Sequence, residues 1–227
     1  MTGPNLLALL VAAATAAPLA VYVSRRPHPQ FVRENHAGRL VPAVLGQALV
    51  VGALLGRQVG FLAGGDDVRW QAWDVVTLSG VFALLVVGVL DDRRTEGPRG
   101  LGGHVASLLR GRPTTGILKL AVGVGAAAAV AALAGDGATR IVFGALLIAA
   151  SVNVTNALDV VPGRALKWVL VVVAAVLAPL WDGTYALLGA ATLGAALAVL
   201  PLDLGEGGML GDGGSNPLGW LDRLGRR

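Results

Sequence analysis

Long apolar stretches alternate with short polar segments along most of the chain. Seven stretches approach the ~20 residues that an α-helix needs to cross the ~30 Å hydrocarbon core of a bilayer. They span Asn5–Val23, Val41–Leu62, Val75–Leu90, Gly116–Ala134, Ile141–Leu158, Leu166–Leu180 and Thr184–Leu200. The third and the sixth are short and must use flanking residues or tilt little. The pattern predicts an all-α integral membrane protein, a single domain over residues 1–227 with about seven transmembrane helices.

Composition also favours a membrane protein over a soluble one. Apolar residues make up 55% of the chain and charged residues only 14%, whereas soluble domains carry roughly 25% charged residues. The 33 glycines follow no three-residue repeat, which fits close helix packing in lipid. The sequence has no cysteine, so disulfides, zinc thiolate sites, iron–sulfur clusters and thiol catalysis are excluded.

The basic residues predict the orientation in the membrane. Of the 18 Lys and Arg residues, all except Arg57, Arg69 and Arg140 follow the first, third, fifth or seventh apolar stretch. Because an excess of Lys and Arg marks the cytoplasmic face, the N-terminus is expected outside and the C-terminus inside a multi-pass cell-membrane protein. Basic loops of this kind are what membrane orientation requires, so nucleic acid is not expected as a partner.

The first of three polar clusters at the predicted cytoplasmic helix ends is Asp91-Asp92, which precedes Arg93 and Arg94. Carboxylates at a helix C-terminus oppose the macrodipole by ~0.3–1 kcal/mol each. A divalent metal or a proton transfer would explain the pair. A solvated helix end is the alternative.

The second cluster comprises Asn153, Asn156 and Asp159. Their i, i+3, i+6 spacing covers about 120° of a helical wheel, so all three are expected to face the bundle interior; interhelical hydrogen bonding by asparagine is the alternative. Arg164 and Lys167 follow on the first turn of the next helix. With the free N–H groups there they form an anion site suited to phosphate, or else they only anchor the cytoplasmic side.

The third cluster is the glycine-rich segment 205–216, which has Asp212 in its middle. Glycine lets backbone approach a ligand closely, and Asp212 is a candidate metal ligand; a flexible tail is the alternative. The four aspartates of the three clusters are expected to gather on one membrane face with the cations Lys119, Arg164 and Lys167. This is the chemistry of a magnesium-held diphosphate at a membrane surface.

In order along the chain, the motifs resemble those of the polyprenyl-phosphate N-acetylhexosamine-1-phosphate transferases, which include phospho-N-acetylmuramoyl-pentapeptide transferase. The segments that carry the resemblance are 35–42, 88–94, 100–104, 114–119, 153–159 and 211–215. It implies transfer of a sugar 1-phosphate from a UDP-sugar to a polyprenyl phosphate at the cytoplasmic face, with release of UMP and a need for Mg²⁺. Such an enzyme serves cell-envelope glycan synthesis.

The resemblance also implies roles for the candidate residues. Asp91 and Asp92 match the acidic pair near the polyprenyl phosphate, Asp159 the second acid of the Asn-x-x-Asp-x-x-Asp motif, and Asp212 a metal ligand. The expected catalytic residues are thus Asp91, Asp92 and Asp159, and the expected Mg²⁺ ligands are Asp159 and Asp212. The expected substrate-binding residues are Asn153, Asn156, Lys119, Arg164 and Lys167.

Two differences from the family leave a second hypothesis open. Asn156 stands where the family motif has its first aspartate, and the chain is expected to be a shortened relative without the last helices and the histidine-rich loop. The alternative to an enzyme is a catalytically lapsed relative that binds lipid-linked intermediates or regulates a partner. A transporter is disfavoured because the polar residues lie at one face instead of the midplane. Small residues in 123–134 and 189–198 predict close helix packing and self-association as a homodimer.

Overall fold

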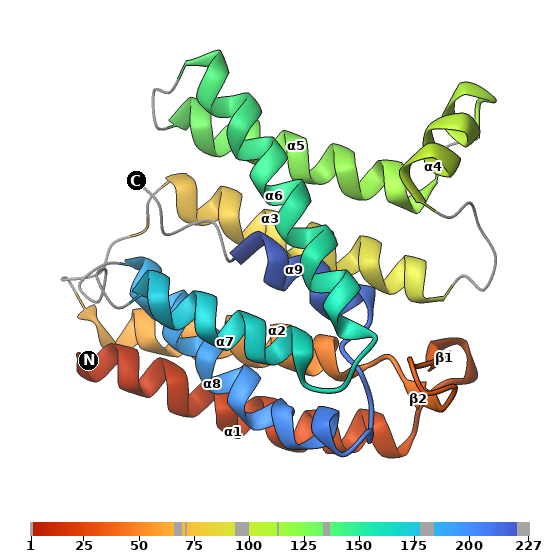
Figure 1. Ribbon diagram of the computed structural model, residues 1–227. Coiled ribbons are helices and arrows are strands. Elements are labelled where there is room, and N and C mark those ends of the chain that lie inside the picture. Colours follow the sequence, from red (N-terminus) through yellow and green to blue (C-terminus); the bar gives the residue numbers. More distant parts are fainter. Residues whose placement is uncertain are drawn as a thin grey trace.

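The structure, a computed structural model, describes residues 2–65, 70, 72–93, 100–112, 114–133, 137–177 and 184–221. Within these ranges the chain is mostly helical (Figure 1). The helices are α1 (Gly3–Arg25), α2 (Leu45–Ala63), α3 (Ala72–Asp92), α4 (Gly100–Leu109), α5 (Thr115–Leu133), α6 (Ala138–Asp159), α7 (Arg164–Leu177), α8 (Thr184–Leu204) and α9 (Asp212–Leu221).

Every predicted apolar stretch corresponds to a helix. Among the described residues, five helices are long and apolar enough to cross a membrane: α1, α2, α3, α6 and α8. The class of protein, all-α with candidate membrane-spanning helices, therefore agrees with the sequence. The apolar part of α5, residues Thr115–Ala126, is shorter than these five helices. Helix α7 has 14 described residues, which at 1.5 Å per residue cover only ~21 Å. Ala134 and residues 178–180 of the predicted spans lie outside the described part. Seven spans and their orientation stay predictions.

Small residues bring α1, α2 and α8 into close contact. A stripe of fully buried alanines on α1 recurs every four residues: Ala8, Ala12, Ala16 and Ala20. The facing glycines of α2 have the same spacing: Gly52, Gly56 and Gly60. A Cβ added to Gly56 would lie only 2.6 Å from the Cβ of Ala12. Matching small residues let two helix backbones approach where lipid offers no hydrophobic driving force for association.

The two stretches predicted to pack closely through small residues behave differently. In 189–198, on α8, a Cβ added to Gly194 would overlap the backbone of Leu9, so this prediction is confirmed. In 123–133, on α5, the nearest atom to a Cβ on Gly123 would be 3.8 Å away, on Ile148, and nothing lies within 4 Å of Gly125. Within one chain these glycines do not pack closely against a neighbouring helix, so that part of the prediction is wrong for them. Self-association stays a prediction.

The glycine-rich segment 205–216 leads into helix α9, which begins at Asp212, so the alternative of a flexible tail is wrong for its second half. Helix α9 packs inside the bundle against α2, α3 and α6 (Figure 1). Gly214 of α9 lies against Gly46 of α2, and a Cβ added to Gly219 would be 2.5 Å from the Cα of Val152 on α6. Glycine and proline disfavour helix intrinsically, but here the lack of a side chain allows a buried helix to fit between its neighbours. Tertiary packing therefore overrides local propensity.

A short β-hairpin joins α1 to α2. It follows a 3₁₀ turn at Pro29–Phe31 and pairs β1 (Val32–Glu34) with β2 (Leu40–Pro42) in antiparallel register. The N–H of Met209 donates to the carbonyl of Pro42 at 2.8 Å, and the N–H of Leu45 donates to the carbonyl of Met209 at 3.1 Å. The hairpin thus holds the connection between α8 and α9, residues 205–211, at one end of the bundle.

Candidate functional site

The polar clusters meet at the end of the bundle that carries the hairpin (Figure 1). Here α3, α6 and α8 end, and α5, α7 and α9 begin. Hydrogen bonds link the ends of α3 and α6 to the start of α9. Segments more than 100 residues apart in the chain are thereby joined, as between Asp92 and Asp212.

Lys119 connects two carboxylates from different helices. Its ammonium lies 2.6 Å from Oδ2 of Asp91, at the end of α3, and also contacts Oδ2 of Asp212, at the start of α9. The Thr115 hydroxyl donates to the other oxygen of Asp91. Thr115 and Lys119 are four residues apart on α5 and share one helix face, so both reach the same carboxylate. We refer to Asp91, Thr115, Lys119 and Asp212 as the lysine cluster.

The lysine cluster is partly open to its surroundings. The side chains of Lys119, Asp91 and Asp212 are 14%, 30% and 20% exposed. Burial raises the pKa of Asp212 and the hydrogen bond with Asp91 raises it further, whereas the charge of Lys119 lowers it. Two adjacent carboxylates are costly to keep charged unless a cation lies beside them, and the fold supplies that cation from α5.

Asp92 caps α9. One carboxylate oxygen accepts the N–H of Asp212 at 3.0 Å, and the other accepts the N–H of Gly213 at 2.9 Å. A carboxylate at this position satisfies free N–H groups and complements the positive end of the helix dipole. The backbone carbonyl of Asp92 accepts from the guanidinium of Arg33 in the hairpin. The carboxylates of Asp91 and Asp92 therefore have different partners, although the two residues are adjacent in sequence.

Asp159 holds the segment that leads into α9. Its two carboxylate oxygens accept the N–H groups of Leu210 at 3.1 Å and Gly211 at 2.8 Å. Gly211 has φ +68°, a backbone conformation that favours glycine. One turn earlier on α6, the amide oxygen of Asn156 accepts the Ser215 hydroxyl at 2.6 Å. This end of α6 thus positions α9 through two side chains.

The prediction that Asn153 faces the bundle interior with Asn156 and Asp159 is wrong, because Asn153 lies on an exposed face of α6. The buried positions of this helix are Ala145, Ile148, Ser151, Thr155 and Asp159. These positions also cover about 120° of the helical wheel, but the centre of their arc differs by ~80° from that of the polar cluster, so Asn153 lies well outside it. A partly buried membrane helix therefore turns one member of that cluster outward.

The predicted anion site at the start of α7 already contains a carboxylate of the chain. Asp203, near the end of α8, accepts the N–H of Gly163 at 2.9 Å and is buried. Arg164 and Lys167, on the first turn of α7, are exposed. In the described part of the chain, no hydrogen bond or ion pair links Arg164 or Lys167 to the lysine cluster. Sequence reasoning missed Asp203, although an acid within the last turn of an apolar helix was a usable signal.

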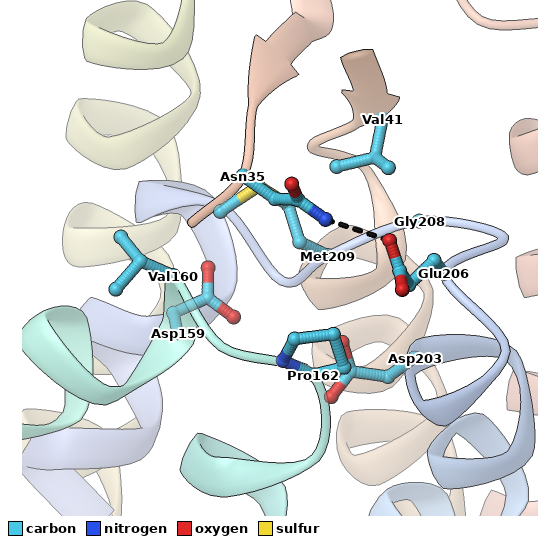
Figure 2. A pocket seen from close by; sticks show the side chains of 9 residues that line it. All are labelled: Asn35, Val41, Asp159, Val160, Pro162, Asp203, Glu206, Gly208 and Met209. Carbon is cyan, nitrogen blue, oxygen red and sulfur yellow. Dashed lines mark hydrogen bonds between the residues drawn. The ribbon is translucent and has the colours of Figure 1, made fainter. Parts of the chain in front are cut away.

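Glu206 is a second acid that sequence reasoning did not assign. It forms an ion pair with Arg39 at 3.1 Å and accepts a hydrogen bond from the Asn35 amide at 2.8 Å (Figure 2). Its φ of +54° is unusual for a residue with a side chain. Both partners belong to the hairpin turn, a segment that carried the family resemblance. Glu206 therefore ties the hairpin to the α8–α9 connection.

A small recess lies between the hairpin, the end of α6 and the α8–α9 connection (Figure 2). Its lining residues are Asn35, Val41, Asp159, Val160, Pro162, Asp203, Glu206, Gly208 and Met209. The space inside it that a water-sized group can occupy is about 10 Å³, roughly the size of a single water site. The recess is therefore too small for an organic ligand such as a nucleotide sugar.

The expected Mg²⁺ ligands have separate partners in this arrangement. Asp159 uses both oxygens on backbone N–H groups, and Asp212 contacts Lys119. Within the described part of the chain, no group of three or more His, Asp or Glu side chains is placed to hold a metal ion. The described residues therefore do not fit a preformed magnesium site on Asp159 and Asp212. The Mg²⁺ requirement itself stays a prediction.

Comparison with protein-family models and with curated proteins finds no match to this chain. The family resemblance and the roles that it implies for the site residues stay predictions.

Proposed function

We propose that this protein is a membrane phosphoglycosyltransferase that transfers a sugar 1-phosphate from a UDP-sugar to a polyprenyl phosphate at the cytoplasmic face. The observation that supports the proposal best is the lysine cluster. It presents an ammonium between two carboxylates at the end of α3, a helix suited to cross a membrane. A lipid phosphate anchored in the bilayer would meet the protein at this depth.

In the proposed reaction an oxygen of the polyprenyl phosphate attacks the β-phosphorus of the UDP-sugar. The bond from this phosphorus to the oxygen bridging the two phosphates breaks, and UMP leaves with that oxygen. Lys119 is suited to attract and orient the acceptor phosphate, because an ammonium acts as a point charge toward phosphate. Asp91 is suited to hold that ammonium in place, because its two oxygens accept from Lys119 and from Thr115. Alignment of two anionic substrates accounts for much of the rate enhancement in phosphoryl transfer.

The experiment is UMP release by purified protein in nanodiscs that contain polyprenyl phosphate. A panel of UDP-sugars is offered at several Mg²⁺ concentrations, which also tests the metal requirement. We expect release with at least one UDP-sugar and a loss of ~10²-fold or more in Asp91→Asn, the magnitude typical of a misplacement of ~1 Å in the group that orients a substrate. Glu34→Gln is the matched control, because this exposed acid lies at the same end of the bundle, in β1. Equal rates in Asp91→Asn and Glu34→Gln would contradict the assignment of Asp91.

The second candidate is a catalytically lapsed relative that binds lipid-linked intermediates or a partner enzyme. The observation in its favour is that three buried acids, Asp92, Asp159 and Asp203, direct their carboxylates at backbone N–H groups. Such acids can be retained for folding alone. Asn156→Asp distinguishes the two candidates, because a retuned enzyme should change its rate or metal requirement. Absence of UMP release from wild type and Asn156→Asp with every UDP-sugar, together with a co-purifying partner enzyme, would favour the lapsed relative.

A further inference from the structure

The position of Lys119 conflicts with the expectation of a bound divalent metal. Asp91 and Asp212 are the two acids of the lysine cluster, and each directs its Oδ2 atom at the same ammonium. A cation shared by two carboxylates from different helices is the arrangement expected of a divalent ion. In this chain the cation is a side chain.

The tether of Lys119 makes it a strong competitor for that position. The side chain begins on α5, one turn after Thr115, and Thr115 binds the second oxygen of Asp91. A tethered group acts at a high effective concentration compared with a free ion. Mg²⁺ also demands near-octahedral oxygen ligands at 2.0–2.1 Å and gives up water reluctantly. Asp91 and Asp212 alone would leave most of that shell to water.

The nearby acids are poorly placed to add ligands. Asp92 and Asp159 each hold two backbone N–H groups of the chain leading into α9. Recruiting either carboxylate to a metal would free buried N–H groups at a cost of ~1–3 kcal/mol each. The local balance therefore favours the ammonium over a metal ion in the protein without substrate.

We infer that Lys119 is a built-in counter-ion that occupies the cation position between Asp91 and Asp212 and excludes divalent metal from it. Removal of the ammonium leaves two uncompensated carboxylates, which become a binding site for a divalent ion. In the wild-type protein a metal reaches these carboxylates only after Lys119 moves away. This holds whether or not the protein is a transferase, because it concerns cation binding alone.

Mn²⁺ titration followed by electron paramagnetic resonance tests this inference on the full chain in nanodiscs. Wild type should show no saturable site that depends on Asp91. Lys119→Met should gain such a site. Its affinity for Mn²⁺ should be at least ~10-fold higher than that of Lys119→Arg, since one charge interaction of ~1.4 kcal/mol corresponds to that factor. The double variant Lys119→Met/Asp91→Asn should lose the gained site, which separates it from Mn²⁺ bound elsewhere.

Lys119→Gln provides a second variant if Lys119→Met does not fold, and Lys119→Arg is the matched control that keeps the charge. A wild-type Mn²⁺ site that is removed by Asp212→Asn would overturn the inference. So would a folded Lys119→Met or Lys119→Gln protein that binds Mn²⁺ no better than Lys119→Arg does. Neither result depends on UMP release, so failure here and failure of the proposed transferase activity can be told apart.

Discussion

The guanidinium of Arg57 lies 2.7 Å from the carboxylate of Asp74, and the two side chains are only 1% and 4% exposed. The guanidinium also lies over the rings of Phe61 and Trp70, at 5.0 and 4.4 Å from their centroids. Arg57 belongs to α2 and Asp74 to the first turn of α3, so the pair joins these helices far from Asp91 at the other end of α3. Buried charges in a membrane helix are expensive unless they are paired.

We expect Arg57→Met and Asp74→Asn each to lower the free energy of unfolding by ~3–5 kcal/mol, because removal of one partner leaves the other charge buried and uncompensated. Thermal unfolding in detergent micelles measures the effect. Arg110→Met, at an exposed arginine, is the control and should leave the unfolding temperature unchanged. If both Arg57→Met and Asp74→Asn unfold at the same temperature as the wild type, the ion pair does not stabilise the fold.

The contact between α1 and α2 should tolerate no added side chain. Gly56→Val places carbon atoms against Ala12 and should destabilise the protein by ~1–3 kcal/mol or more, as overpacking does. Gly125→Val, on α5 where nothing lies within 4 Å of the added Cβ, is the matched control. Thermal unfolding of both variants under the same conditions decides the question. Similar losses in the two variants would mean that the α1–α2 contact is not tight.

The predicted orientation can be tested with single cysteines, because the natural sequence has none. Leu109→Cys lies at the exposed end of α4, on the predicted cytoplasmic side, and Gly137→Cys caps α6 on the predicted outer side. A membrane-impermeant maleimide should label Gly137→Cys in intact cells and Leu109→Cys only after the membrane is opened. Identical labelling of the two positions would contradict both the orientation and the shared cytoplasmic site.

The adjacent acids Asp91 and Asp92 should differ in their effect on stability. Asp92→Asn turns an amide group toward one of the two N–H groups at the start of α9 and should cost ~1–3 kcal/mol, the penalty for an unsatisfied buried donor. Asp91→Asn keeps an oxygen for the Thr115 hydroxyl and should cost less. Thermal unfolding and protease cleavage within α9 measure the difference. Equal sensitivity of the two variants would argue against the capping role of Asp92.

Much of the site could be predicted because polar residues at the ends of apolar stretches are local sequence features. Asp91, Asp159 and Asp212 were found in this way, and the structure places all of them at one end of the bundle. The partner of each acid could not be predicted, because it depends on helix rotation: Asn153 faces outward, whereas Asp159 on the same helix is buried. Arg57 lies within the predicted span Val41–Leu62, but its pairing with Asp74 could not be predicted from the sequence.

The sequence by itself determined that the chain forms apolar helices, because hydropathy over a window of about 20 residues depends on neighbouring residues alone. Close packing through small residues was predicted for 123–134 and 189–198, whereas the contact of Gly52, Gly56 and Gly60 with α1 was found only in the structure. Only the tertiary structure decided that the segment after Gly211 is a buried helix and that Lys119 lies between Asp91 and Asp212. The physical reason is that both features are produced by contacts between distant segments, which outweigh the local preferences of glycine and of charged residues.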